Sequence, residues 1–358
     1  MNHAPTRLAQ GGRGGQVSRR PDADSWRKIN LSDATRLRLT LACGDYDINQ
    51  GLIDGSVQPE GIDLVTITLH SPERHWRMMR GLEFDVCELS LGSYLLICDQ
   101  RSLPFVAIPA FPHRRFRHSY FFVGADSRIG APKDLEGRKV GIRTWQNTAL
   151  VWQRGILEEH YGVDITKILW YRQDEEDVPI AIPPEFKVVQ VEQGRTVNQM
   201  LLDGEIDALL YPEMPSSFKQ GDQRVRRLFP DAKAEEQRFY RETGLFPLMH
   251  TVVIKEELLE RFPWVATSML KAFRESKDLA WKLMEDPRRI SLAWVRELIE
   301  EQREILGRDP WPYELSANRI ALETMIRYAR RQGIVTRQLS PEDLFFPPSL
   351  EVMPVGYV

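Results

Sequence analysis

One plan is shared by MMRGLEFDVCELSLGSY (residues 78–94) and QMLLDGEIDALLYPEMPSS (residues 199–217). Each stretch runs from a helical pattern through a glycine and an acidic residue into a short apolar strand, and then into a polar loop. Strands that alternate with helices favour mostly parallel sheets, whose ligands bind beyond the carboxyl ends of the strands. The repeat therefore predicts two α/β lobes of related plan, with a ligand site at the loops that follow these strands.

Alternation of apolar residues extends this plan around the first repeat. The pattern predicts a strand over 37–42, a strand over 62–67, a helix that is capped by Ser71 and ends at Gly81, and a strand over 84–89. Asp45 lies in the polar turn after the first strand, and Ser90 and Ser93 follow the third. These three polar residues are therefore expected at one end of the first sheet.

The second repeat is embedded in a similar pattern. The sequence predicts a strand over 139–142, a long helix from the loop at 143–148 to about His160, a helix over 196–202 and a strand over 206–211. Glu213 follows the last of these strands. The polar side chains after both strands are expected at the ligand-binding edge of the second sheet.

Two apolar strands join the lobes in this prediction. One covers residues 119–123 and the other covers 248–254, so the chain crosses between the lobes twice and forms a hinge. Helical spacing over 263–306 and 318–331 predicts C-terminal helices packed on the first lobe. The predicted divisions are a disordered tail at 1–35, lobe one at 36–123, lobe two at 124–246, and the return to lobe one with the C-terminal helices at 247–358.

Composition narrows the classes of partner. The 358 residues carry 48 Lys and Arg against 51 Asp and Glu, a formal net charge of −3, so the charge pattern argues against a nucleic-acid partner. Three cysteines, Cys43, Cys87 and Cys98, indicate neither a disulfide framework nor a zinc cluster. No apolar run fits an export signal or a membrane helix. A reduced, cytoplasmic protein that binds a small ligand is expected.

Other catalytic templates are absent from the sequence. It contains no G-x-S-x-G elbow, no Walker A motif, no H-E-x-x-H helix and no G-x-G-x-x-G after a strand. No spacing of His, Asp and Glu suggests a metal site, although such residues can also converge from distant loops.

Several segments together resemble a known family. The chain from about residue 37 to residue 350 is similar to the 4,5-dihydroxyphthalate decarboxylase branch of the type II periplasmic-binding-protein fold. The similar segments are ACGDYD (42–47), FDVCELSLGSYL (84–95), IPAFPHRRFRHSYFFV (108–123), DLEGRKVGIRTWQNTALVWQRGIL (134–157), LYPEMPSSF (210–218) and TGLFPLMHTVVI (243–254). This resemblance implies a cytoplasmic carboxy-lyase for a small aromatic acid and a homo-oligomer. The alternative is a non-catalytic solute-binding protein for a small aromatic or heteroaromatic anion, and the lack of an export signal favours the enzyme.

The implied reaction sets chemical requirements. Direct loss of CO₂ from an aryl carboxylate leaves a poorly stabilised aryl carbanion, so the easier route protonates the ring carbon first. A base removes the proton of the hydroxyl para to the departing carboxylate, and an acid protonates the carbon that carries this carboxylate. Cations must hold the retained carboxylate. The route needs no redox or electron-sink cofactor.

The basic segment 111–118, FPHRRFRH, is the densest source of such groups. Arg115 and Arg117 are predicted to bind the substrate because guanidinium groups bind carboxylates bidentately. His118, next to the first crossing strand, is the predicted proton donor to the ring, and His113 is expected at the surface. The alternative interpretation is a solvated basic loop.

His250 lies in the return crossing strand. It is the alternative acid or the base for the phenol, and a hydrogen-bonded core histidine is the competing interpretation. The sequence does not decide which histidine delivers the proton.

The loop at 143–148 directly precedes a helix, whose first N–H groups can bind an anion. Arg143 and Thr148 are predicted to bind the substrate there, although helix capping alone also explains Thr148. Trp145 is predicted to stack on the aromatic ring, and a packed tryptophan between the lobes is the alternative.

Four further strand-end residues complete the predicted site. Ser90 and Ser93 are expected to bind the substrate, and Asp45 and Glu213 to orient or deprotonate a phenol. Asp45 and Glu213 are equally compatible with roles as turn formers.

Overall fold

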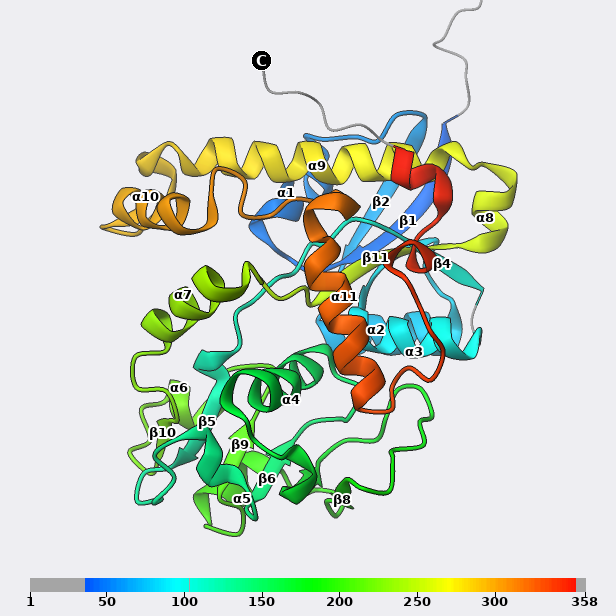
Figure 1. Cartoon of the computed structure of the whole chain (residues 1–358). Helices are drawn as coiled ribbons and strands as arrows, with labels where there is room; N and C mark the ends of the chain where they lie inside the picture. The colour runs from blue at the N-terminus through cyan, green and yellow to red at the C-terminus, as the bar shows by residue number, and fades with distance from the viewer. Residues whose placement is uncertain (1–35, 103, 352–358) are drawn as a thin grey trace, which may run out of the picture. The chain divides into compact units, whose positions relative to one another are not determined.

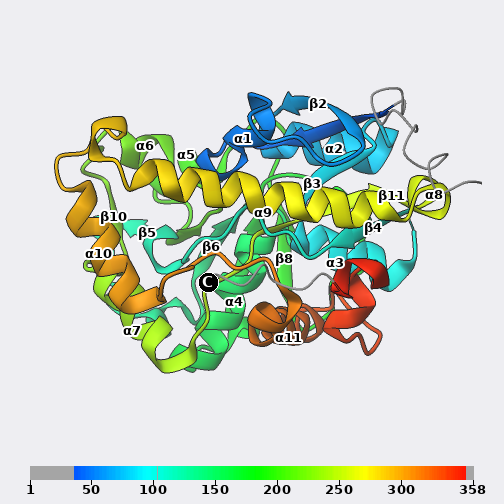
Figure 2. The same cartoon turned by 90° about the horizontal axis from the view of Figure 1, so that it is seen from above.

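The computed structural model describes residues 36–102 and 104–351 of the chain. The predicted disordered tail at 1–35 lies outside these residues. The described residues from Leu37 form one compact unit that contains two β-sheets with helices packed on them (Figures 1 and 2). None of the described helices is long and apolar enough to cross a membrane.

The first sheet has the strand order β2-β1-β3-β11-β4. Its strands are β1 (Leu37–Cys43), β2 (Ile62–Thr68), β3 (Val86–Ser90), β4 (Phe105–Ile108) and β11 (His250–Lys255). β1 pairs in parallel with β2 and β3, whereas β11 runs antiparallel between β3 and β4. Every residue of β3 is buried, because helices cover this central strand on both faces.

The second sheet has the strand order β10-β5-β9-β6-β7-β8. Its strands are β5 (Phe121–Gly124), β6 (Lys139–Ile142), β7 (Leu169–Arg172), β8 (Lys187–Gln190), β9 (Ala208–Leu210) and β10 (Val225–Arg227). β6 pairs in parallel with β7 and β9, and β5 runs antiparallel to β9 and β10. Each sheet thus combines a parallel part with an antiparallel strand from one of the two predicted crossing segments.

The described α-helices are α1 (Gln50–Ile53), α2 (Ser71–Gly81), α3 (Leu91–Gln100), α4 (Thr148–Tyr161), α5 (Val197–Leu202), α6 (Ser216–Lys219), α7 (Ala232–Thr243), α8 (Glu256–Arg261), α9 (Trp264–Met284), α10 (Val295–Leu306) and α11 (Leu315–Arg331). In α4, every residue over 148–157 is buried, because α11 and α3 pack on the helix from outside the second sheet. This burial fixes the first turn of α4 next to the first turn of α3.

The C-terminal helices differ in part from the prediction. The segment 263–306 forms two helices, because Pro287 and the short polar stretch after α9 interrupt the helical pattern. α9 packs on α1 and on the short helical turn over Asp47–Asn49 that follows β1, so it lies on the first lobe as predicted. Figure 2 shows α9 lying along α1. α10 instead packs on α7, and α11 packs mainly on α4. The prediction that the C-terminal helices pack on the first lobe is therefore wrong for α10, whereas α11 contacts both α4 and, in the first lobe, α3.

Candidate active site

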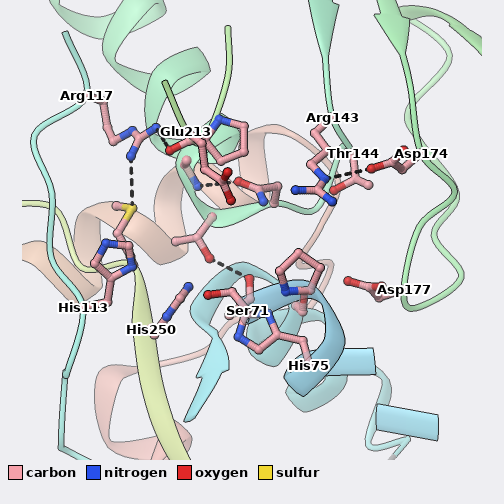
Figure 3. Close-up of a pocket in the computed structure, with 18 of the residues that line it drawn as sticks. Ser71, His75, His113, Arg117, Arg143, Thr144, Asp174, Asp177, Glu213 and His250 are labelled. Atoms are coloured by element: carbon pink, nitrogen blue, oxygen red, sulfur yellow. Dashed lines mark hydrogen bonds and ion pairs between the residues drawn. The ribbon is translucent and has the colours of Figure 1, made fainter. Parts of the chain in front are cut away.

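A pocket lies where the carboxyl ends of the parallel strands of the two sheets face each other (Figure 3). Its volume is about 140 Å³, similar to that of a protein cavity that takes one benzene ring. From the first sheet and its helices the pocket is lined by Ser71, Pro72, His75, Ser90, Ser93, His113, Met249 and His250. From the second it is lined by Arg117, Arg143, Thr144, Asn147, Thr148, Ala149, Asp174, Glu175, Asp177, Pro212 and Glu213.

Hydrogen bonds between α3 and α4 close one wall of the pocket. The Thr148 hydroxyl lies 2.8 Å from the hydroxyl of Ser90 and accepts a hydrogen bond of 2.8 Å from the Gly92 N–H. Asn147 is the N-cap of α4, because its side chain accepts the Ala149 N–H. Thr148 is therefore the first helical residue and joins the two sheets, rather than acting as the cap.

His250, the first residue of β11, contacts a buried ion pair that is formed by Glu88 and Arg74. Nδ1 of His250 lies 2.5 Å from Oε1 of Glu88, and Nη2 of Arg74 lies 3.0 Å from the same oxygen. The side chains of Glu88 and Arg74 are fully buried. Burial raises the pKa of Glu88, but the charge of Arg74 and the contact with His250 outweigh that effect and lower the pKa. Glu88 is therefore an ionised carboxylate at neutral pH.

Two further imidazoles pack on His250. The ring centroid of His113 lies 4.7 Å from that of His250, and the centroid of His75 lies 4.9 Å from it on another side. Burial lowers the pKa of all three histidines, and the charge of Glu88 opposes the shift at His250. The predicted surface position of His113 is wrong, because this histidine lines the pocket. The N–H of Met249, directly before β11, donates to the His113 carbonyl and holds the loop after β4 next to β11.

Arg117 supplies a cation to the opposite part of the pocket wall. It is 1% exposed, and its guanidinium donates to the carbonyls of Tyr211 (2.9 Å) and Pro212 (3.0 Å) and covers the ring of Tyr120. No described carboxylate forms an ion pair with it, and its Nε has no hydrogen-bond partner among the described residues. Burial lowers the pKa of Arg117 to about 9, so the group stays charged at neutral pH.

Acidic side chains line the rim on the side of the second sheet. Asp174 pairs with Arg143 at 2.8 Å, so this predicted arginine reaches the pocket already partnered. Burial and the charge of Glu176 raise the pKa of Asp177. Glu213 is half exposed and lies 3.4 Å from Nε2 of His70, which precedes α2 in the first lobe. The rim can therefore accept hydrogen bonds from hydroxyl groups.

The structure does not bring His118 to this pocket. His118 is fully buried, and its ring packs against Phe229, Phe239 and Tyr161. Both ring nitrogens are without a hydrogen-bond partner within the part of the chain that the structure describes, and burial lowers the pKa to about 4. The physical reason is that η4 (His118–Tyr120) turns this side chain towards α7 before β5 begins.

Three other predicted residues lie away from the pocket. Arg115 is exposed and donates to the hydroxyl of Tyr120. Trp145 is fully buried, donates to the Gln332 carbonyl and stacks under Arg154, so it is the packed tryptophan of the alternative interpretation. Asp45 is exposed and accepts from the side chain of Gln50.

The structure thus gathers Ser90, Ser93, Arg117, Arg143, Thr148, Glu213 and His250 from the sequence-based candidates. Sequence reasoning missed Glu88 and Arg74, although an acidic residue inside the apolar strand 84–89 was a usable signal, since a buried carboxylate needs a partner. It also missed Asp177. Among the described residues, no group of three or more His, Cys, Asp or Glu side chains is arranged to hold a metal ion.

Comparisons with known proteins agree on the fold. A sulfonate-binding protein SsuA of a putative ABC transporter from Methylobacillus flagellatus has a TM-score of 0.53 at 14% identity and covers 88% of this chain and 93% of its own. The desulfurization enzyme DSZB has a TM-score of 0.50 at 13% identity, over 88% of this chain and 98% of its own. The predicted periplasmic-binding-protein-like fold is confirmed.

Sequence comparison is more specific. A scan against protein-family models finds no match. A 4,5-dihydroxyphthalate decarboxylase from Comamonas testosteroni is 36% identical over 325 residues, which are 88% of this chain and 98% of the relative. Another from Pseudomonas putida is 34% identical over 212 residues, 58% of this chain and 82% of the relative. The chain belongs to the 4,5-dihydroxyphthalate decarboxylase family.

Proposed function

We propose that this protein decarboxylates 4,5-dihydroxyphthalate to protocatechuate in the pocket between the two sheets. The reaction breaks the bond between the ring and one carboxylate, forms a C–H bond at the same carbon and releases CO₂, so it consumes one proton. The similarity to two 4,5-dihydroxyphthalate decarboxylases supports the substrate and the carboxy-lyase activity.

The observation that carries the proposal at the site is the charge of Arg117. A buried guanidinium without a carboxylate partner is costly, and a bound anion removes this cost. Arg117 therefore binds the carboxylate that the substrate retains. The hydroxyls of Ser90 and Thr148 lie in the same pocket and share one hydrogen bond, which leaves one hydroxyl hydrogen that can be donated to this anion.

His250 is the proposed proton-transfer residue. Its Nδ1 faces Glu88, which leaves Nε2 as the ring nitrogen that can meet a substrate. A neutral imidazole can take the proton of the hydroxyl para to the departing carboxylate, and electron density then moves to the carbon to be protonated. His113 and His75 stay neutral in this proposal, and either can pass a proton from His250 towards this carbon by accepting it at one ring nitrogen while releasing one from the other.

The acidic rim suits the catechol end of the substrate. Glu213 and Asp177 accept hydrogen bonds from the two ring hydroxyls in this proposal, and Arg143, held by Asp174, keeps the rim from carrying an unbalanced negative charge. Ser93 lies at the start of α3 beside Ser90 and completes the wall. Asp45, Arg115, His118 and Trp145 have no part in the proposed site.

We also propose that the segments 36–123 and 247–358 belong to one lobe and 124–246 to the other, with α10 and α11 packing across onto α7 and α4 of the second lobe. The enzyme acts in the cytoplasm as a homo-oligomer on a small aromatic carboxylate in this proposal. The two separate sheets support the division. The three cysteines, which are free in the structure, fit a reducing compartment.

Purified protein incubated with 4,5-dihydroxyphthalate tests the function. We expect equal amounts of CO₂ and protocatechuate, and their loss in His250→Gln. Tight binding of the compound without release of CO₂ would instead identify a solute-binding protein, and neither binding nor turnover would exclude both functions.

A further inference from the structure

Only one of the three pocket imidazoles has a carboxylate partner. His250 contacts Glu88 through Nδ1, whereas Nε2 of His75 and Nδ1 of His113 are buried without a hydrogen-bond partner among the described residues. The three rings are in contact through His250, whose centroid lies within 5 Å of both others. The contact with Glu88 therefore distinguishes His250 from His75 and His113.

We propose that Glu88 is a positioning residue for the decarboxylation, which holds Nδ1–H of His250 towards itself and makes His250 the imidazole of this cluster that carries the proton during turnover. The inference rests on the proposed function for the reaction, and on the contacts of Glu88 for the choice of histidine. It assigns a chemical role to a buried pair, Glu88 and Arg74, that does not line the pocket.

The hydrogen bonds of Glu88 fix the tautomer of His250. An ionised carboxylate only accepts hydrogen bonds, so the ring nitrogen that faces it must carry the hydrogen. Oε2 of Glu88 is occupied by the Gly44 N–H at 2.7 Å, and Oε1 is shared by His250 and Arg74. Nε2 of His250 therefore holds a lone pair and accepts the phenol proton, and the imidazolium that forms remains paired with Glu88.

Arg74 keeps Glu88 available for this task. Its Nε donates to the Glu88 carbonyl at 3.0 Å and its Nη1 to the Leu69 carbonyl at 2.6 Å, so the guanidinium is fixed by backbone contacts on β3 and on the segment between β2 and α2. The fixed cation lowers the pKa of Glu88 and prevents the carboxyl from taking the proton of His250. The proton thus stays on the imidazole that faces the pocket.

The charged groups around the cluster disfavour a proton on the other two rings. His250 is faced by Glu88 from β3, by Arg74 and His75 from α2, and by His113 from the loop after β4. Burial, the charge of a protonated His250 and the charge of Arg74 all lower the pKa of His75. Burial and His250 likewise lower the pKa of His113, with smaller contributions from Arg115 and Arg117.

The pH profile of Glu88→Gln tests the proposal. We expect kcat to fall at least about 100-fold, a typical contribution of general acid–base catalysis. The acidic limb of kcat/KM should move to lower pH, because the carboxylate that raises the pKa of His250 is removed. Asp85→Asn is the matched control: Asp85 precedes the same strand and accepts from the N–H and hydroxyl of Thr40, away from the pocket. It should leave the limb where it is.

A limb that stays in place in Glu88→Gln, with a fall in kcat no larger than in Asp85→Asn, would overturn the proposal, since a merely structural Glu88 does not move the limb. Glu88→Gln leaves Arg74 buried without its counter-ion, so this variant is at risk of not folding.

Nitrogen NMR of the unmodified protein provides the second measurement, because it needs no substitution at Glu88. With ¹⁵N-labelled histidine and His250→Gln for assignment, we expect the Nδ1–H tautomer for His250 and, on acidification, a proton taken up by His250 before His75 and His113. An Nε2–H tautomer, or first protonation of His75 or His113, would overturn the proposal. The measurement involves no turnover. If the protein proved inactive, the proposed function would be refuted, but the NMR experiment would still test whether Glu88 sets the tautomer of His250.

Discussion

Arg117 is a charged side chain that the fold buries without a counter-ion of its own. Two backbone carbonyls and the ring of Tyr120 compensate part of the loss of hydration, but Nε remains without a partner among the described residues. An isolated buried charge costs several kcal/mol. Arg114 and Arg154 are also buried without a carboxylate partner among the described residues, but of the three only Arg117 lines the pocket, and this position is the reason that we propose a ligand anion as its partner.

Arg117→Met separates binding from stability. We expect kcat/KM for 4,5-dihydroxyphthalate to fall about 100-fold or more, because charge-assisted hydrogen bonds to the carboxylate are worth about 1.5–3 kcal/mol each. The melting temperature should stay or rise, since a buried charge is removed. Arg115→Met, at the exposed neighbouring arginine, is the control and should leave both quantities unchanged. Equal kinetic effects in the two variants would remove Arg117 from the site.

His118→Phe tests whether the aromatic environment of this residue has any part in the reaction. The ring lies among Tyr161, Phe229 and Phe239, and neither ring nitrogen has a partner, so phenylalanine fits the environment chemically. We expect full activity in steady-state kinetics. A loss of more than about 10-fold, with folding intact by circular dichroism, would return His118 to the mechanism.

The same residue governs part of the stability at acid pH. The folded-state pKa of His118 is about 4, below its ordinary value of 6.5, so the unfolded state binds more protons between these two pH values. Stability is therefore full above pH 6.5 and falls by up to about 3 kcal/mol as the pH drops to about 4. Urea unfolding of wild type and His118→Phe should show a flatter pH dependence in the variant. Parallel curves would contradict the burial of a neutral imidazole.

At the scale of elements, the site depends on how closely α3 approaches the loop before α4. Gly92 lies in the first turn of α3, and a Cβ atom there would collide with the backbone carbonyl of Gln146 and meet the backbone of Thr148. Because the obstacle is backbone, it cannot rotate away. The absence of a side chain at this position therefore allows the hydrogen bond between the Gly92 N–H and Thr148.

Gly92→Ala should accordingly disturb both folding and the site. We expect a loss of about 1–3 kcal/mol in the free energy of unfolding, typical of overpacking, together with a lower kcat/KM. Gly124→Ala is the control, because a Cβ at that glycine meets nothing within 4 Å. Denaturant unfolding and kinetics of both variants check the expectation, and identical behaviour of the two would refute the close approach.

Most elements could be predicted from local pattern. The strand over 139–142 agrees with the structure, because apolar alternation is a strong local signal. α2 ends at Gly81 as predicted and begins at Ser71 with His70 as its N-cap, one residue earlier than the predicted cap at Ser71, because a proline in the first helical turn marks a helix start closely. The break between α9 and α10 was missed, and so was the packing of α11 on α4. These features depend on contacts between distant segments that no local pattern contains.

Some residues of the candidate site could likewise be predicted from local pattern, and others could not. Strand ends such as Ser90, Arg143 and Glu213 were predictable, because the carboxyl ends of parallel strands gather in space. The choice between Arg115, Arg117 and His118 was not, since η4 turns adjacent side chains in different directions within one short segment. An acidic residue at position 88 signals a buried partner, but identifying that partner as His250 required knowing that β3 and β11 are neighbours in the sheet.

At the scale of the whole molecule, the pocket belongs to neither sheet alone. His250 and Ser90 belong to strands of the first sheet, Thr148 begins a helix that follows a strand of the second, and Arg117 lies in the segment that connects the two sheets. A ligand that touches both groups stabilises the arrangement in which they face each other. Binding to the folded state alone raises its stability in proportion to the logarithm of the ligand concentration over Kd.

Phthalate, which lacks the hydroxyl groups that start the reaction, is a suitable ligand for this test. At about 100 times its Kd it should add about 2.7 kcal/mol and raise the melting temperature by a few degrees. The shift should be absent in Arg117→Met and present in Arg115→Met. Differential scanning calorimetry measures it, and a shift retained in Arg117→Met would place the anion elsewhere.

A crystal structure with bound phthalate tests the central claim most directly. The account predicts one carboxylate within hydrogen-bond distance of the Arg117 guanidinium and the ring next to Nε2 of His250, with Nδ1 still on Glu88. A ring bound outside the pocket, or in the pocket with both carboxylates away from Arg117, would contradict it.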